Sequence, residues 1–434
     1  MKINKITIRG EKQGAPIETE PSNNLELKEV YVVGTTTRGE TERHTINISN
    51  DKVVEFVFDD GTSWFSSNDT IEDVFPEAVA MRKRSLDGEV EIPVVLQTGP
   101  GERGIVDAVA LKLLKVFARK EVKKTIRQLA EDLEKKQLGN KSGLFRLDLN
   151  FDLQKDFTTD TGQPFLLFIH GTNSSTTGSF SEIIGTEFWK YITKTYDQHI
   201  LAFQHETLTK SPLQNVLDLI KQLPANITLH LVSHSRGGIV GDTLSRYCIS
   251  NQNNAGFSEV EIEFLNKEGR VDDIKCIKSI RNEVSKKNIT VQKFIRVACP
   301  ASGTTLASKR LDHFFNVTFN LLGLAIGGTV NPVYVAFKDL MACVVNSKDD
   351  ISVLPGLEAM NPESPFIKVL NYPNPLAIID NSLVIISGNG KANLNFKALV
   401  IIASKLFFDS QNDLSQYSFH VQWNKTTRNG SVLF

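Results

Sequence analysis

The segment from Leu229 to Gly241, LHLVSHSRGGIVG, restricts the fold of this 434-residue chain more than any other feature. An apolar stretch runs into a short turn of small and polar residues, and a helical pattern follows at once. A strand, a sharp turn and a helix in this order lift the central residue of the turn, Ser235, to the end of a strand. Such a turn needs small residues two positions before and after its centre, and these are Ser233 and Gly237. The segment therefore predicts an exposed serine beside a helix N-terminus, where the helix dipole favours negative charge.

The first small position is Ser233 rather than the glycine of the G-x-S-x-G pattern. Serine is small enough for the turn, so the pattern tolerates it. A serine- and glycine-rich turn between a strand and a helix also occurs without any catalytic role. The segment alone does not establish chemistry at Ser235.

A second motif lies upstream, where the continuous apolar run Phe165 to Ile169 ends in His170, Gly171, Thr172 and Asn173. Acyl transfer needs two backbone N–H groups directed at the developing oxyanion. We expect one from Arg236, which follows the serine, and the other from Thr172. Gly171 allows a close backbone approach, and we expect His170 to support this loop rather than to transfer protons.

Strand and helix patterns alternate after about residue 160, which predicts an α/β fold with a mostly parallel sheet covered by helices on both faces. Apolar runs predict strands over 165–169, 200–203, 228–232, 294–298 and 383–386, and helical patterns cover 182–195, 212–223 and 237–248. A charged insertion over 251–290 carries seven acidic and seven basic residues, which predicts a solvated helical excursion.

The N-terminal third is organised differently. Residues 1–100 read as short strands, with a hairpin signal at Asp60-Gly61. Residues 101–155 contain a helical pattern at Val122, Ile126, Leu129 and Leu133, with Gly139 as its C-terminal cap. We therefore expect a β-rich domain over 1–100, a helical connector over 101–155 and the α/β domain over 156–434.

The sequence resembles the α/β-hydrolase superfamily, in its lipase/esterase-like branch. The resemblance rests on FLLFIHGTN at 165–173 and LVSHSRGG at 231–238, with further support from RVACPASGTTLA at 296–307 and LPGLEAMNPESPFIKVLN at 354–371. It covers roughly 160–415. A weaker similarity is to the lipase-like domains of large bacterial multidomain proteins. The resemblance implies an α/β-hydrolase fold and a serine hydrolase that cleaves acyl esters.

In that superfamily an acid and then a histidine follow the nucleophile. Asp413, in an Asn-Asp-Leu setting after the strand at 383–387, is the predicted acid, and Asp409 is the alternative. His420 is the predicted base, although only seven residues separate it from Asp413. His313 precedes the acid, so its order is wrong.

Three interpretations of the histidine stay open. His420 is the base on a short connection, or the base lies beyond Phe434, or the domain has lost catalysis and serves as a module for ligand binding or protein interaction. Without a base, the Ser235 hydroxyl is a weak nucleophile because no group takes its proton.

The apolar stretch over 311–345 follows the strand at 294–298, where hydrolases insert caps. It is predicted either as a lid opening onto acyl chains or as a buried helix pair beside the sheet. An acyl ester or lipid-like molecule is the expected substrate, and the N-terminal domain is the expected site of any protein partner.

Composition sets the remaining limits. A formal net charge of −1 gives no global electrostatic reason to bind nucleic acid. No apolar run of 18 residues predicts a transmembrane segment, and the N-terminus lacks a signal-peptide core. The four cysteines match neither a zinc motif nor a disulfide scaffold, so we expect a cytoplasmic protein. The phosphate-loop and H-E-x-x-H motifs are absent, so no cofactor or metal is expected.

Overall fold

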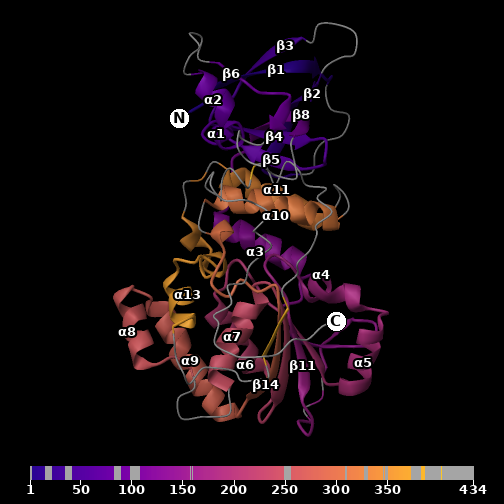
Figure 1. Cartoon of the computed structure of the whole chain (residues 1–434), viewed down its shortest axis with the longest axis vertical. Helices are drawn as coiled ribbons and strands as arrows, with labels where there is room; N and C mark the ends of the chain where they lie inside the picture. The colour runs from indigo at the N-terminus through magenta and orange to yellow at the C-terminus, as the bar shows by residue number, and fades with distance from the viewer. Residues whose placement is uncertain are drawn as a thin grey trace.

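A computed structural model of the chain contains two β-sheets at opposite ends of an elongated molecule, with helices between them (Figure 1). Within the described residues, no helix combines the length and the apolar character needed to cross a membrane. The structure describes residues 2–14, 22–34, 42–82, 89–97, 108–156, 158, 160–248, 256–307, 310–326, 331–345, 347, 350–372, 383–386 and 402.

The first sheet has the strand order β3-β1-β2-β8-β4-β5, with β6 beside β1 and β7 beside β8. Neighbours along this path are antiparallel. Two short helices, α1 (Ile71–Val74) and α2 (Pro76–Arg82), accompany the sheet. Its strands are β1 (Lys5–Lys12), β2 (Leu25–Val33), β3 (Arg43–Asn47), β4 (Lys52–Phe58), β5 (Ser63–Ser66), β6 (Val90–Glu91), β7 (Val95–Gln97) and β8 (Ala108–Arg119).

The predicted hairpin around Asp60-Gly61 joins β4 to β5, and Gly61 takes a positive φ of 84° there. The expected boundary at residue 100 is wrong, because β8 lies inside the first sheet between β2 and β4. The helical prediction for 101–155 missed β8, whose residues alternate between buried and more exposed positions. Only the later part of 101–155 forms the predicted helix, α3 (Ile126–Gln137). Gly139 follows it with a φ of 59°.

The second sheet is mixed, with the order β10-β9-β12-β11-β13-β14-β15. The five strands from β12 to β15 pair in parallel, whereas β9 is antiparallel to β12 and to β10. The expected start of this domain at residue 156 is therefore also too late. Its strands are β9 (Gly143–Leu147), β10 (Leu153–Gln154), β11 (Phe165–Ile169), β12 (Ile200–Gln204), β13 (Thr228–His234), β14 (Thr290–Val297) and β15 (Leu383–Ile386).

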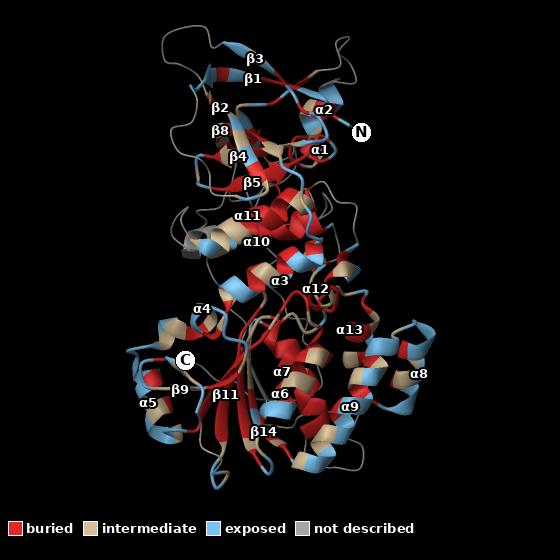
Figure 2. Ribbon diagram, turned by 180° about the vertical axis from the view of Figure 1, so that it is seen from behind, coloured by how far each residue is buried: buried red, intermediate tan, exposed pale blue. Residues whose placement is uncertain are grey.

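Helices cover both faces of the second sheet, and its central strands β11, β12 and β13 are almost entirely buried (Figure 2). Alternate residues of β11 enter two different cores: Phe165 and Leu167 pack on one face, and Leu166 and Phe168 on the other. The first face is covered by α6 (Pro212–Gln222), α7 (Gly237–Cys248) and α9 (Val271–Lys287). The second is covered by α5 (Glu187–Tyr196). Burial on both faces explains why these strands are continuously apolar.

Several predicted helices were confirmed with shifted ends. The helix expected over 182–195 begins later, as α5 at Glu187, and it is preceded by α4 (Thr176–Phe180) and the 3-10 turn η1 (Ser181–Ile183). The charged insertion forms α8 (Glu259–Lys267) and α9, with mainly exposed charges. Further downstream lie η3 (Thr305–Ala307), η4 (Ile351–Val353), α12 (Pro355–Glu358) and α13 (Pro365–Leu370).

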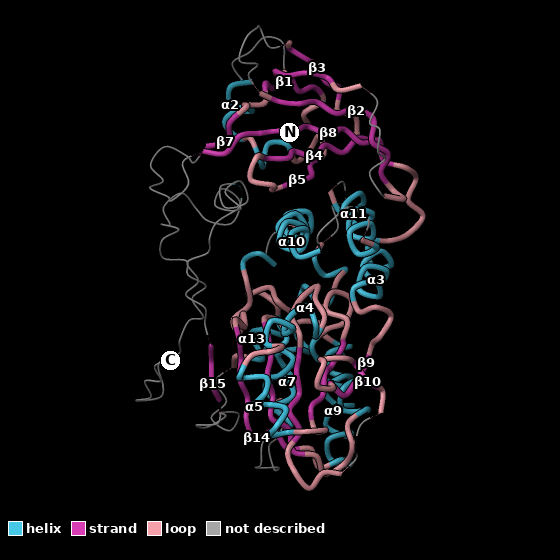
Figure 3. The backbone as a smooth tube through the Cα atoms, turned by 90° about the vertical axis from the view of Figure 1, so that its right-hand side faces the viewer, coloured by secondary structure: helices cyan, strands magenta, loops and turns pink. Residues whose placement is uncertain are grey.

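The apolar stretch over 311–345 forms α10 (Leu311–Ile326) and α11 (Pro332–Val344), which lie with α3 between the two sheets (Figure 3). Two asparagines of α10 bind the free edge of β5. The side-chain amide of Asn316 donates to Phe65 O and accepts from Phe65 N, and Asn320 does the same with Ser63. The amides replace a neighbouring strand, so the first domain holds α10 firmly.

Candidate active site

Ser235 occupies a strained turn between β13 and α7. Its φ is 52°, in the left-handed region that residues other than glycine rarely adopt. The strand ends at His234 and the helix begins at Gly237, so the turn consists of two residues. Ser235 N donates to Val297 O of β14 at 2.9 Å, which fixes the turn to the neighbouring strand. The predicted strand–turn–helix geometry is therefore present around Ser235.

Close packing explains the small residues after the serine. A Cβ atom on Gly237 would lie 2.3 Å from Ile169 O and 2.6 Å from His170 O. One on Gly238 would lie 2.2 Å from the sulfur of Cys299. Any side chain at these positions would push α7 away from the sheet, so the start of the helix admits only glycine.

The loop after β11 lies directly against the serine. β11 and β13 are parallel neighbours with Ile169 opposite Ser233, so both strands end at the same edge of the sheet. A Cβ atom on Gly171 would lie 2.8 Å from the Cβ of Ser235 and 3.1 Å from His234 O. The two sequence motifs thus meet at one point, although 64 positions separate Gly171 from Ser235 in the sequence.

The backbone N–H groups of Thr172 and Arg236 have no hydrogen-bond acceptor among the described residues. Their neighbours do: Gly171 N donates to Ser179 Oγ at 3.4 Å, and Asn173 N donates to Thr207 Oγ1 at 2.9 Å. Backbone N–H groups near the interior normally find an acceptor. The N–H groups of Thr172 and Arg236 belong to the two loops that meet at Ser235.

His170 is completely buried and holds two loops together. Its Nε2 accepts a hydrogen bond from His205 N at 3.1 Å, so its Nδ1 carries the proton that it donates to Gly171 O at 3.0 Å. Burial lowers the pKa of His170 to about 4. The imidazole is therefore neutral at pH 7, and both its nitrogens are occupied by the loops it supports.

The side chain of Arg236 is buried and structural, a role that the sequence did not reveal. Its guanidinium donates to Gly356 O at 3.0 Å, to Lys210 O at 2.7 Å and to Asn215 Oδ1 at 3.1 Å. Burial lowers the pKa of Arg236 to about 10, and the nearby Glu134 acts in the opposite direction. These contacts hold the backbone of Arg236 in place next to Ser235.

The two residues before the serine carry unused polar atoms. No described residue hydrogen-bonds to Ser233 Oγ or to His234 Nδ1, and both atoms are buried. The position of a Gly171 Cβ is 3.3 Å from His234 Nδ1, so the imidazole lines the same corner as the serine. Burial lowers the pKa of His234. Sequence reasoning gave this histidine no role.

The predicted acid and base, Asp413 and His420, lie outside the described residues, as does the alternative Asp409. His313 contacts the first domain, with its Nε2 3.1 Å from Asp73 Oδ2. Of the predicted site residues that it describes, the structure therefore brings together Ser235, Gly171, Thr172 and Arg236.

One group of side chains has the composition of a metal site. Ligand atoms of Asp73, Asp312 and His313 lie within 4.8 Å of one another at the junction of α1 and α10. The guanidinium of Arg310 binds both carboxylates, at 2.9 Å from Asp312 Oδ1 and 3.1 Å from Asp73 Oδ2. The positive charge of Arg310 already neutralises these acids, so the cluster forms an ion-pair network between the two domains.

Comparisons with solved structures gave partial overlaps with bacterial lipases and esterases. The Bacillus licheniformis lipase BlEst2 in mature form has 17% identity and a TM-score of 0.26, over 57% of this chain and 71% of that one. Lipase 1 from Pelosinus fermentans has 14% identity and a TM-score of 0.28, over 51% of this chain and 66% of that one. EstA from Clostridium botulinum has 11% identity and a TM-score of 0.30, over 58% and 68%.

All three TM-scores lie below 0.5, so these overlaps are too partial to assign an activity to this chain. This chain also spans slightly less than two thirds of the Pelosinus lipase. No curated protein matches the sequence. One family model matches residues 145–262 and 276–418, which is more than half of the chain. The chain belongs to the family described as Domain of unknown function (DUF7379).

Proposed function

We propose that the chain is a serine hydrolase of lipase/esterase type, built on an α/β-hydrolase arrangement of the second sheet, with Ser235 as its nucleophile. The observation that carries the proposal is the strained φ of 52° at Ser235, in a two-residue turn against which Gly171 packs at van der Waals contact. Strain of this kind persists where the surroundings enforce it, and it concentrates at functional sites.

The unbonded N–H groups of Thr172 and Arg236 supply the oxyanion hole of this proposal. Attack of Ser235 Oγ on an ester carbonyl forms a tetrahedral intermediate, and its oxygen gains negative charge as the C=O π bond breaks. Donors that are already fixed and unpaired stabilise this charge without reorganisation. The N-terminus of α7 adds a favourable dipole.

The serine needs a base to take its proton, and His420 with Asp413 fills this role in the proposal; Asp409 is the alternative acid. The histidine returns the proton to the leaving alkoxide. Water then releases the acyl group from Ser235 by the reverse sequence, which regenerates the enzyme. The chemistry requires no metal or cofactor.

The proposed substrate class rests on the apolar helices α10 and α11, which connect to the site through α3. α3 packs on α11, and α3 contacts the loop that contains Thr172. We assign α10 and α11, which the first domain anchors through Asn316 and Asn320, as the predicted lid region, a cap over an acyl ester or lipid-like substrate. The protein acts in the cytoplasm, and the first domain is the surface for any protein partner.

Hydrolysis of p-nitrophenyl esters of increasing acyl length by the full chain tests the proposal. Ser235→Ala should abolish activity, whereas Ser285→Ala, an exposed serine of α9, should leave it unchanged. His420→Ala and Asp413→Asn should reduce kcat by at least about 1,000-fold if they complete the site. Comparison of Asp413→Asn with Asp409→Asn identifies the acid.

Absence of hydrolysis by the well-folded chain with every ester would contradict the proposal. It would leave the non-catalytic module, in which the same serine corner serves ligand binding or protein interaction.

A further inference from the structure

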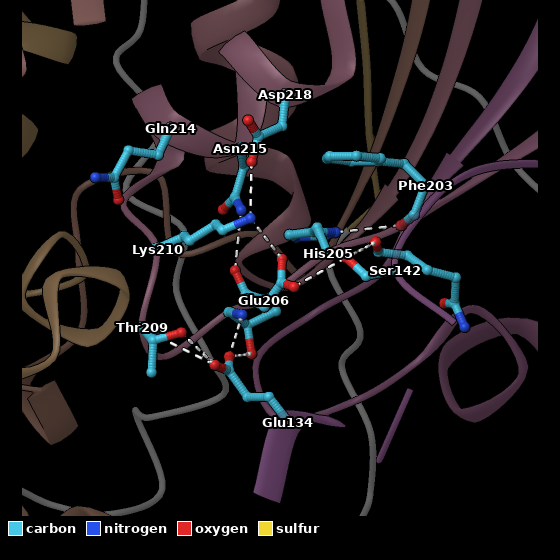
Figure 4. A network of polar contacts seen from close by, with 12 residues as sticks. Glu134, Ser142, Phe203, His205, Glu206, Thr209, Lys210, Gln214, Asn215 and Asp218 are labelled. Atoms are coloured by element: carbon cyan, nitrogen blue, oxygen red, sulfur yellow. Dashed lines mark hydrogen bonds and ion pairs between the residues drawn. The ribbon is translucent and has the colours of Figure 1, made fainter. Parts of the chain in front are cut away.

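The loop after β12, residues 205–210, receives a buried carboxylate from a distant helix (Figure 4). Glu134 of α3 accepts hydrogen bonds from the backbone N–H groups of Thr207, Leu208 and Thr209, and from the Thr209 hydroxyl. Three consecutive N–H groups that converge on one carboxylate form an anion-binding concavity. Glu134 fills this concavity from within the chain and is only 3% exposed.

The loop 205–210 in turn holds the loop after β11, which contains Thr172. Thr207 Oγ1 accepts from Asn173 N at 2.9 Å, next to the unbonded N–H of Thr172. The side-chain amide of Gln137, one turn further along α3, donates to Asn173 O. The residue after Thr172 is therefore held at both its N–H and its C=O, and both links lead back to α3.

The same loop also holds the turn at the serine. The Arg236 guanidinium donates to Lys210 O at 2.7 Å and to Gly356 O at 3.0 Å, and Gly356 N donates to Leu208 O at 2.8 Å. Arg236 is completely buried, and the charge of Glu134 favours its protonated form. Both backbone N–H groups of the proposed oxyanion hole are thus tied to the loop that Glu134 organises.

Glu131, another acidic residue of α3, serves as a comparison for Glu134. Glu131 is half-exposed and pairs with Arg127 on the surface, one turn apart. Among the described residues its carboxylate bonds to Arg127 rather than to the loop 205–210, and that guanidinium also donates to Thr209 O at 3.2 Å. Glu134 instead points inward, and its oxygens accept from backbone N–H groups and from the hydroxyls of Thr207 and Thr209. The family match begins at residue 145, so α3 lies outside it.

We propose that Glu134 is a positioning residue for the oxyanion donors, holding the N–H groups of Thr172 and Arg236 at Ser235 through the loop 205–210. The inference rests on the proposed serine hydrolase function. It makes α3 a functional part of the hydrolase-like unit, although its sequence precedes the family match. Glu134 itself touches no substrate.

The test measures kcat and KM for a p-nitrophenyl ester in Glu134→Ala, Glu134→Gln and the control Glu131→Ala, together with amide hydrogen exchange at residues 171–174. Glu134→Ala should lower kcat about 10- to 100-fold with little change in KM, because a misplaced donor weakens only transition-state binding. Exchange at 171–174 should become faster in the same variant.

The conservative variant separates positioning from packing. The amide oxygen of Gln at 134 still accepts from Thr207 N and Leu208 N, whereas its nitrogen cannot accept from Thr209. Glu134→Gln should therefore recover part of the lost kcat. If Glu134→Ala does not fold, Thr207→Val carries the test, since it removes only the hydroxyl that binds Asn173 N.

A folded Glu134→Ala protein with unchanged kcat, or with a raised KM at unchanged kcat, would overturn the inference, as would an equal loss in Glu131→Ala. If the unmodified chain hydrolyses no ester, the proposed function fails instead. The exchange measurement then still decides whether Glu134 orders the loop at 171–174, and unchanged exchange in Glu134→Ala would overturn that claim as well.

Discussion

The two sheets differ in where their strands end and in how the backbone polar groups at their edges are hydrogen-bonded. Strands along the first sheet alternate in direction, so their ends are divided between two edges. From β12 to β15 the second sheet is parallel, so the carboxyl ends of β11 and β13 bring their following loops together at one edge. A parallel sheet concentrates loop chemistry in a way that an antiparallel one does not.

The edges of the two sheets show the same contrast in hydrogen bonding. The edge of β5 that pairs with no strand is covered by Asn316 and Asn320, whose amides hydrogen-bond to the backbone of Ser63 and Phe65. At the carboxyl edge of the second sheet, the N–H groups of Thr172 and Arg236 stay without a described acceptor. The first edge is closed by side chains, and the second has two donors without an acceptor among the described residues, beside a strained serine.

Apart from substitutions of the proposed triad itself, the largest expected effect lies at the contact between the loop after β11 and the turn at Ser235. Gly171→Ala would place a Cβ 2.8 Å from the Cβ of Ser235, so one of the loops must shift. A shift of about 1 Å at a reacting centre costs roughly 100-fold in rate. We expect ester hydrolysis to fall by about that factor. Gly14→Ala in the first domain, where a Cβ meets nothing within 4 Å, should hydrolyse at the unaltered rate.

Acid should weaken the second domain through His170. Burial lowers its pKa from 6.5 to about 4, so the unfolded chain binds a proton over a pH range in which the folded chain does not. Its contribution is fully present above pH 6.5 and is lost as the pH falls toward 4, by up to about 3 kcal/mol.

Urea unfolding followed by circular dichroism between pH 7 and pH 4 measures this loss. His170→Asn should reduce the pH dependence without abolishing it, because burial also lowers the pKa of His205 and of His234, and both still titrate. An unaltered slope in that variant would show that His170 is not the group responsible.

Loss of a side-chain amide that covers the edge of β5 should lower the free energy of unfolding. Asn320→Ala leaves Ser63 N and Ser63 O without their side-chain partners in a buried place. Buried unsatisfied groups cost about 1–3 kcal/mol each, so we expect a loss of about 2 kcal/mol in the free energy of unfolding. Leu321→Ala changes the next residue, which is exposed, and is the matched control. Equal unfolding midpoints for the two variants would contradict the role of the amide.

The smallest effect is expected on the surface of the first sheet. Arg9 and Glu91 form an ion pair at 2.9 Å with both side chains more than 40% exposed. Such pairs contribute about 0–1 kcal/mol. Glu91→Gln should therefore shift the urea midpoint by less than the error between repeats, and a loss comparable to that of Asn320→Ala would be inconsistent with this account.

The sequence predicted the elements that depend on local signals. The apolar strands at 165–169 and 228–232, the sharp turn at Ser235 and the hairpin at Gly61 are each defined by a few adjacent residues, and the structure contains them all. The contact between Gly171 and Ser235 followed from parallel strand order, because neighbouring parallel strands end at one edge.

The sequence could not show contacts between segments far apart in the chain. β8 looked like part of a helical connector because nothing local reveals that it pairs with β2 and β4. Glu134 has the same appearance in the sequence as Glu131, and only the fold shows which of them is buried against the loop at 205–210. The structural use of the Arg236 guanidinium depends likewise on Gly356, which lies 120 positions away.

Reaction of the full chain with a fluorophosphonate, followed by peptide mass spectrometry, tests the central claim most directly. The account predicts one stoichiometric adduct on Ser235, formed at a rate that falls in Gly171→Ala and vanishes in Ser235→Ala. A folded chain that gains no adduct, or one that carries it on a different serine, would contradict the assignment of Ser235 as a nucleophile.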